Sequence, residues 1–155
     1  MSESIRRIFP GNNSTCGFYS YYEQRLEGME QIYILKGGPG TGKSSLLKGL
    51  SERFRREGFE VEHWLCSSDP DSLDGLILLR QKVAVVDGTA PHIVEPRYPG
   101  AVETIVNLGD CWEDTILKQE KERIRALSDG ITGAFATAYE YTAKIGQIDS
   151  LMQAL

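Results

Sequence analysis

The 155-residue sequence predicts an α/β fold, in which a parallel sheet is flanked by helices and followed by a helical C-terminal segment. Short apolar runs alternate with an amphipathic stretch, which is typical of parallel strands joined by helical crossovers. The motif G-x-x-x-x-G-K-[ST] occurs at residues 37–44, directly after the first apolar run and before the amphipathic stretch. The motif requires this strand–loop–helix context. The predicted class is therefore a P-loop NTPase-like fold.

The first strand and the first helix flank this motif. Residues 31–36 are a short β-rich apolar run that stops at two glycines, which predicts a buried strand that meets a turn. Over residues 43–56, apolar side chains recur at steps of three and four while charged side chains fill the other face. This pattern predicts an amphipathic helix that ends at Gly58.

Two more strands are expected before residue 90. Residues 59–65 alternate, with Phe59, Val61, His63 and Leu65 on the more buried face, and a short helix is expected through residues 76–79. Residues 83–86 form a continuous apolar run of the kind that a parallel sheet buries on both faces. The three predicted strands end at Gly37, Cys66 and Asp87. Ligands collect beyond the carboxyl ends of parallel strands, so these ends mark the expected site.

The remainder of the chain predicts helices and no further strand. Helices are expected at residues 102–108, 112–127 and 131–155, whereas residues 11–14 are expected to form a polar loop. We interpret residues 1–155 as one nucleotide-binding domain, with an α/β core over about residues 1–110 and a helical extension over about residues 111–155. The last helix lacks a stop signal, which suggests a piece of a longer protein. Its helically spaced residues favour a core face over an interface: Phe135, Ala138, Tyr139, Thr142, Ile145 and Ile148.

Composition narrows the function classes. The formal net charge is −5, which is the wrong sign for a broad surface that binds nucleic acid or an anionic membrane. The three cysteines, Cys16, Cys66 and Cys111, are odd in number and far apart, so we expect reduced thiols. The N-terminus has no apolar leader and no segment is long enough to span a bilayer, so a cytoplasmic protein is expected.

The glycine-rich loop predicts a site for ATP and Mg²⁺. Glycines let successive backbone N–H groups point inward, and the helix that follows adds its positive end, so together they hold phosphate oxygens. Lys43 is expected between the β- and γ-phosphates, and the Ser44 hydroxyl is expected on Mg²⁺. Because no Asn-Lys-x-Asp guanine signature occurs, ATP is preferred over GTP. The predicted nucleotide-binding residues are Gly38, Pro39, Gly40, Thr41, Gly42, Lys43, Ser44 and Ser45.

Asp87 is the expected second acidic element of the site. It lies at the end of a buried strand, where it is predicted to hold Mg²⁺ together with Ser44. The next residue is Gly88, so the acidic pair that polarises water in many mechanical ATPases is missing. Lys43, Asp87 and Asp71 are the predicted catalytic residues. Other candidate groups lie after the second and third strands, namely the possible bases Asp69, Asp74, His92 and Glu95 and the possible charge stabiliser Arg97.

Several stretches beyond the loop add a resemblance. They are residues 11–13, 17–20, 34–45, 66–75, 86–92, 98–102 and 107–109. Through them the chain resembles a family of uncharacterised bacterial P-loop ATPases, a resemblance that covers most of residues 11–112. It implies that residues 67–75 and 88–92 line the site. It also implies that this chain is an N-terminal half, with a second P-loop half as partner. A homo-oligomer is the alternative partner.

Three functions stay open at this point. The first is a Mg-dependent ATPase or nucleotide-dependent switch that hydrolyses the γ-phosphate. The second is a small-molecule or nucleotide kinase, in which Asp69 or Asp71 accepts a proton from the acceptor and Arg123 and Arg125 serve as lid arginines. The third is an ATP-binding interaction module without turnover, which an exposed apolar stripe on residues 131–155 would favour.

Overall fold

The computed structural model describes residues 5–153. Within these, residues 5–12 and 20–111 form one compact unit, and residues 13–19 and 112–153 form another. No helix among the described residues combines the length and the apolar character needed to cross a membrane. Each unit is described by itself below.

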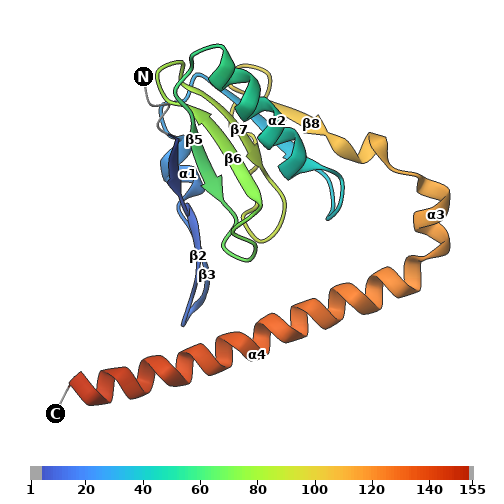
Figure 1. The fold of residues 1–155 in the computed structure, drawn as a ribbon. Helices are drawn as coiled ribbons and strands as arrows, with labels where there is room; N and C mark the ends of the chain where they lie inside the picture. Colours follow the sequence, from blue (N-terminus) through green and yellow to red (C-terminus); the bar gives the residue numbers. More distant parts are fainter. Residues whose placement is uncertain (1–4, 154–155) are drawn as a thin grey trace. The chain divides into compact units, whose positions relative to one another are not determined.

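The first unit is built on a six-stranded sheet (Figure 1). Its strands, in spatial order, are β1 (Arg6–Ile8), β5 (Glu62–Leu65), β6 (Leu73–Leu78), β7 (Val83–Asp87), β4 (Gln31–Lys36) and β8 (Glu103–Asn107). Strands β4 and β7 are the predicted first and third strands, and β5 covers the second half of the predicted residues 59–65. The strand before the glycine-rich loop and the strand that ends at Asp87 are therefore direct neighbours.

The sheet is mixed, so the prediction of an all-parallel sheet is wrong. β1 pairs parallel with β5, and β4 pairs parallel with both β7 and β8, but β6 is antiparallel to both of its neighbours. The short helix expected through residues 76–79 is instead part of β6. All six residues of β6 are buried, because the strand lies inside the sheet between β5 and β7, and four of the six are leucine or isoleucine. A tight turn, in which the Lys82 amide donates to the Leu79 carbonyl, joins β6 to β7.

The segment expected as a helix at residues 102–108 contains β8 instead. Three consecutive β-branched residues, Thr104, Ile105 and Val106, fit a pleated surface better than a helix. The strand pairs with β4 from Ile32–Glu103 to Lys36–Asn107. Long-range pairing with a central strand has therefore overridden the local helical pattern.

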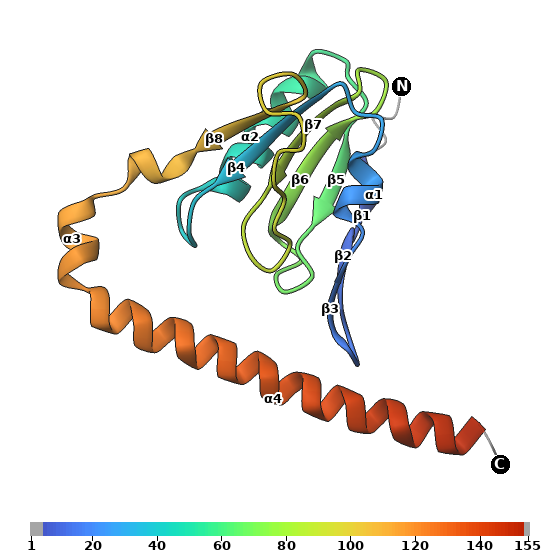
Figure 2. The ribbon, with the colours of Figure 1, turned by 180° about the vertical axis from the view of Figure 1, so that it is seen from behind.

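Apolar side chains pack on both faces of this sheet. On one face lies helix α2 (Lys43–Arg56), whose bounds match the prediction and whose Leu47 is fully buried against Leu35 and Val85 (Figure 1). On the other face Ile34, Trp64 and Val86 pack with residues of helix α1 (Tyr22–Leu26), on the side that Figure 2 presents. The core therefore fixes the strand ends from which the site residues come.

Strand β5 buries the charged side chain of Glu62, which the alternating sequence pattern predicts on the less buried face. Glu62 and Trp64 are both buried, contrary to the expected orientation of the strand. Glu62 is compensated by Arg6 at 3.1 Å and Arg25 at 2.6 Å, and it accepts a hydrogen bond from the Trp64 indole. A carboxylate that is paired and hydrogen-bonded in this way tolerates burial.

The second unit contains residues 13–19, which form most of a two-stranded ribbon, and the C-terminal helices. Strands β2 (Gly11–Ser14) and β3 (Gly17–Ser20) pair with each other, so the expected loop at residues 11–14 is a strand. A 3₁₀ turn (Leu108–Cys111) in the first unit precedes α3 (Asp114–Gln119) and α4 (Lys121–Gln153). The predicted break between residues 127 and 131 is absent, because α4 runs unbroken for 33 residues.

The apolar stripe on α4 is not a core face. Among the described residues of this helix, Phe135, Ile145 and Ile148 are exposed, and the half-buried Tyr139 hydrogen-bonds to Asn13 of the β2–β3 ribbon. The prediction that this stripe is internal is therefore wrong.

Candidate functional site

The glycine-rich loop between β4 and α2 has the backbone that its sequence requires. Gly40 and Gly42 have φ angles of 80° and 86°, a conformation that side chains with a Cβ rarely adopt. A Cβ at Gly37 would lie 2.8 Å from the Thr41 hydroxyl oxygen, so that position also demands glycine. The Thr41 hydroxyl closes the turn by donating to the Gly38 carbonyl at 2.8 Å. The curled loop therefore depends on the glycines that the motif supplies.

Lys43 lies between the loop and the neighbouring strand end. Its ammonium donates to the carbonyls of Gly37 at 2.6 Å and Gly38 at 3.0 Å, and it is 3.5 Å from Oδ2 of Asp87. Both side chains are about nine-tenths buried. The cation predicted to bind phosphate and the carboxylate predicted to bind Mg²⁺ therefore face each other.

Ser44 and Asp87 are held in fixed orientations. The Ser44 hydroxyl oxygen accepts a hydrogen bond from the amide of Leu73, at the start of β6, with an N–O distance of 2.9 Å. Oδ1 of Asp87 accepts from both the amide and the hydroxyl of Thr89, at 2.8 and 2.6 Å. One carboxylate oxygen is thus held by its own turn, while the other, Oδ2, faces Lys43. Ser44 keeps a further lone pair, so the pair offers two oxygen ligands to a hard cation.

The structure explains why no carboxylate follows Asp87. A Cβ on Gly88 would overlap the side chain of Ile34 and would lie 3.1 Å from the backbone oxygen of Val94. The ammonium of Lys36 lies next to the same position and donates to the carbonyls of Gly88 and Val94, both at 2.9 Å. Any side chain at position 88 would disrupt this packing, so the residue after Asp87 cannot supply a carboxylate.

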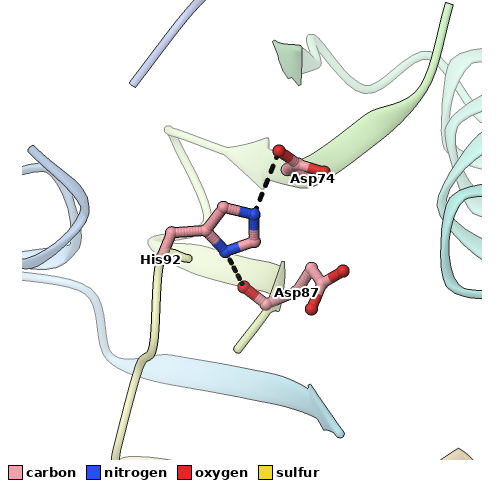
Figure 3. Close-up of side chains that lie close together, drawn as sticks. All are labelled: Asp74, Asp87 and His92. Carbon is pink, nitrogen blue, oxygen red and sulfur yellow. Dashed lines mark hydrogen bonds and ion pairs between the residues drawn. The ribbon is translucent and has the colours of Figure 1, made fainter. Parts of the chain in front are cut away.

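Asp87 forms a buried cluster of polar side chains with Asp74 and His92 (Figure 3). Nε2 of His92 is 3.1 Å from Oδ2 of Asp74, and Nδ1 of the same ring is 3.1 Å from the backbone oxygen of Asp87. A backbone carbonyl only accepts hydrogen bonds, so Nδ1 carries a proton and Nε2 faces the Asp74 carboxylate. Because β6 pairs Gly75 with Val86 on β7, Asp74 and Asp87 are the next residues on adjacent strands.

The surroundings of this cluster favour a charged imidazole. Burial by itself lowers the pKa of His92, but the hydrogen bond and the charge of Asp74, with a smaller effect of Asp87, outweigh it and raise the pKa above 6.5. Tyr22 stacks on the His92 ring with centroids 4.7 Å apart, and its hydroxyl donates to Asp74 at 3.4 Å. Burial also raises the pKa of Tyr22, so the phenol stays protonated.

The same cluster has the composition of a metal site. Asp74, Asp87 and His92 each offer one ligand atom, and these atoms lie within 4.8 Å of one another. Two carboxylates and one imidazole suit a divalent cation, and the Nδ1 hydrogen bond to a carbonyl is the usual way of orienting a metal-binding histidine. The group can therefore hold either a proton shared between His92 and Asp74 or a cation.

Four other predicted residues lie away from this cluster or have another role. Asp69 and Asp71 are exposed, and the Asp71 amide donates to Oδ1 of Asp69 in a local turn. Glu95 forms an ion pair with Lys36, and Arg97 lies over the ring of Tyr98. The structure brings Lys43, Ser44 and Asp87 together with Asp74 and His92, but it does not bring Asp71 into this group.

A separate cleft of about 670 Å³ lies in the first unit, between α1 and the segment after β7. Among the described residues, its lining includes Glu23, Glu27, Glu95 and Glu103, with Arg97 as the one cation, and none of the loop residues 37–44. Four carboxylates against one guanidinium repel a triphosphate, so the cleft is the wrong place for a nucleotide.

Searches against protein-family models, curated proteins and solved structures find no match to this chain.

The sequence pattern does not connect four of the residues that build this region. Tyr22 carries no site signal, Lys36 is the last residue of a predicted strand, and Asp74 and His92 are separate candidates. The signal available was the polar Asp74 at the start of an apolar run, together with a histidine five residues after Asp87. Pairing them required the antiparallel β6, which the sequence did not reveal.

Proposed function

We propose that the chain binds ATP with Mg²⁺ at residues 37–44 and hydrolyses its γ-phosphate, acting as an ATPase or a nucleotide-dependent switch. One observation supports this most: Lys43 and Asp87 meet at 3.5 Å, at the adjacent ends of β4 and β7, beside a loop whose glycines leave its backbone open to phosphate. This arrangement is what phosphoryl transfer demands of a protein, because the reaction depends on positioning and on neutralising charge.

The residues have distinct parts in this reaction. Lys43 exchanges the Gly37 and Gly38 carbonyls for oxygens of the β- and γ-phosphates. Ser44 and Asp87 would hold Mg²⁺, which would supply positive charge to neutralise the phosphate oxygens. A water oxygen bonds to the γ-phosphorus, the bond to the β–γ bridging oxygen breaks, and ADP, phosphate and a proton are released. Asp74 is a buried carboxylate beside Asp87 that can accept that proton, and its contact with His92 holds it in place.

The test measures binding and turnover on matched variants. Wild type should bind Mg-ATP and release phosphate, whereas Lys43→Ala should lose both. Lys48→Ala is the control, because Lys48 is an exposed lysine on the same helix. Binding of ATP should raise the melting temperature of wild type and of the control, but not that of Lys43→Ala. Equal phosphate release by wild type and Lys43→Ala would rule out this site.

The assay also separates hydrolysis from kinase activity. Phosphate released without an acceptor supports the hydrolase, and ADP formed only when a nucleoside monophosphate or a sugar is added supports the kinase. Asp71→Asn belongs in the same panel, because the kinase reading gives that residue the proton of the acceptor. ATP binding without ADP formation would favour the interaction module, which the exposed stripe on α4 also supports.

A further inference from the structure

Helix α4, which belongs to the second compact unit, carries a continuous row of apolar side chains that we call the seam. Starting at Ile124, apolar or aromatic side chains recur at alternating steps of three and four residues over four heptads. The seam consists of Ile124, Leu127, Ile131, Ala134, Ala138, Tyr141, Ile145, Ile148 and Met152. All nine are exposed, and the seven larger side chains have between 40 and 70% of their surface accessible. Apart from the hydroxyl of Tyr141, no polar or charged group occurs at these nine positions.

The spacing of this seam is that of a coiled coil. Alternating steps of three and four repeat every 3.5 residues, which keeps the a and d positions of a heptad facing one partner helix. The three glycines of α4, Gly130, Gly133 and Gly146, all fall outside the seam. Each glycine costs a helix about 1 kcal/mol relative to alanine, and helices in water owe most of their stability to a packed face. A 33-residue helix with three glycines therefore needs a partner along its seam.

The contacts within the second unit leave the seam open. The Tyr139 hydroxyl donates to Asn13 at 2.7 Å, and Thr15 lies against Gly146. Both helical positions are b positions, about 100° around the helix from a. The β2–β3 ribbon therefore touches the flank of α4 and not its apolar seam.

The charges that border the seam fit a second copy of the same helix. In a parallel pair, each g position lies beside the e position five residues later on the partner helix. These pairs are Arg123–Ser128, Gly130–Phe135, Thr137–Thr142 and Lys144–Asp149. None brings like charges together, and Lys144–Asp149 is attractive and occurs twice by symmetry. An antiparallel pair sets g beside g, where both charged residues, Arg123 and Lys144, are cations.

From this geometry we infer that α4 forms a parallel, in-register, two-stranded coiled coil with a second copy of this chain. The inference rests on α4 alone and does not depend on the nucleotide site.

The first test measures the mass of the full chain in solution. Wild type at about 50 µM should sediment at twice the 17.3 kDa of one chain, and it should dissociate on dilution. Ile131→Glu with Ile145→Glu places charges at two a positions, and it should weaken the dimer by at least 100-fold. Thr132→Glu with Gln147→Glu adds the same charge at exposed b and c positions, and it should leave the dimer intact. A monomeric wild type, or equal effects of both double variants, overturns the inference.

The second test fixes the orientation and remains informative if the seam variants unfold. Lys144→Glu alone and Asp149→Lys alone should each weaken the dimer several-fold, and the two together should restore it. In a background of Cys16→Ser and Cys111→Ser, Ile148→Cys should form an intermolecular disulfide on oxidation. The parallel pair places these two sulfurs side by side, whereas an antiparallel pair separates them by several turns. No rescue by the double exchange, or no cross-link at residue 148, overturns the parallel arrangement.

Discussion

The glycine-rich loop and the helix α4 represent two ways in which a sequence encodes a surface. At the loop, each side chain is held by specific polar partners: Lys43 by backbone carbonyls and Asp87, Ser44 by the Leu73 amide of β6, and Asp87 by Thr89 in its own turn. On α4, nine apolar or aromatic side chains repeat at a fixed spacing and remain exposed. Among the described residues, the side chains of the first arrangement contact one another, whereas those of the second are exposed. A mutation should therefore act on geometry in the loop region and on intrinsic helix stability or association in α4.

The largest expected effect is on turnover and comes from Asp87. Asp87→Asn removes the carboxylate charge that faces Lys43 and that would hold the proposed Mg²⁺, so phosphate release should fall by about 100-fold. Thr89→Val removes one of the two hydrogen bonds that orient Asp87, and it should cost only about 5- to 10-fold, or roughly 1 kcal/mol. Steady-state phosphate release over a range of Mg²⁺ concentrations distinguishes the two variants. Equal losses for both would show that the charge of Asp87 has no role of its own.

Two glycine-to-alanine substitutions should change stability in opposite directions, one in each region. Gly88→Ala forces a Cβ into the Ile34 side chain, so it should lower the free energy of unfolding by about 1–3 kcal/mol. Gly130→Ala adds a Cβ where no atom lies within 4 Å, on a helix, so it should raise helix stability by about 1 kcal/mol. Thermal unfolding followed by circular dichroism measures both. A stabilising Gly88→Ala would contradict the close packing around position 88.

The two histidines of the chain should affect stability with opposite pH dependence. The folded-state pKa of His92 is raised above 6.5, so its contribution is complete below pH 6.5 and is lost as pH rises through the folded value. The pKa of His63 is lowered, mainly by burial and then by the charges of Arg7 and Arg55, so its contribution is complete above pH 6.5 and is lost at lower pH. Denaturant unfolding in chelator, of wild type against His92→Gln and His63→Gln, measures both trends.

The outcome for His92 also bears on the cluster with Asp74. If the difference in stability between wild type and His92→Gln does not shrink as pH rises above 6.5, the shared proton is absent and a neutral ring pairs with Asp74. Asp74→Asn should remove the same pH dependence, because it removes the main cause of the raised pKa.

The smallest expected effect comes from the exposed turn at residues 69–72. Asp71→Asn changes an exposed side chain, so stability should change by less than about 0.5 kcal/mol. A large loss of turnover with unchanged stability would restore Asp71 as a catalytic residue. Melting temperature and phosphate release on the same sample check both quantities.

The sequence by itself determined the features that depend on local chemistry. The bounds of β4 and α2 and the position of Asp87 at the end of a strand follow from apolar periodicity and from glycines that interrupt it. The heptad spacing of α4 also follows from the sequence, but the exposure of its side chains does not. Local patterns persist in the fold because each residue of a helix or a loop interacts mainly with near neighbours.

Only the tertiary structure decided which segments pair and which residues meet. The antiparallel β6 replaced an expected short helix, β8 replaced another, and β5 buried Glu62 against Arg6 and Arg25. These outcomes depend on contacts between residues far apart in the chain, where pairing and burial outweigh local propensity by more than the fractions of a kcal/mol that separate helix from strand. The same pairing of β6 with β7 placed Asp74 beside His92 and Asp87, because strand register alone brings distant polar residues to one edge of a sheet.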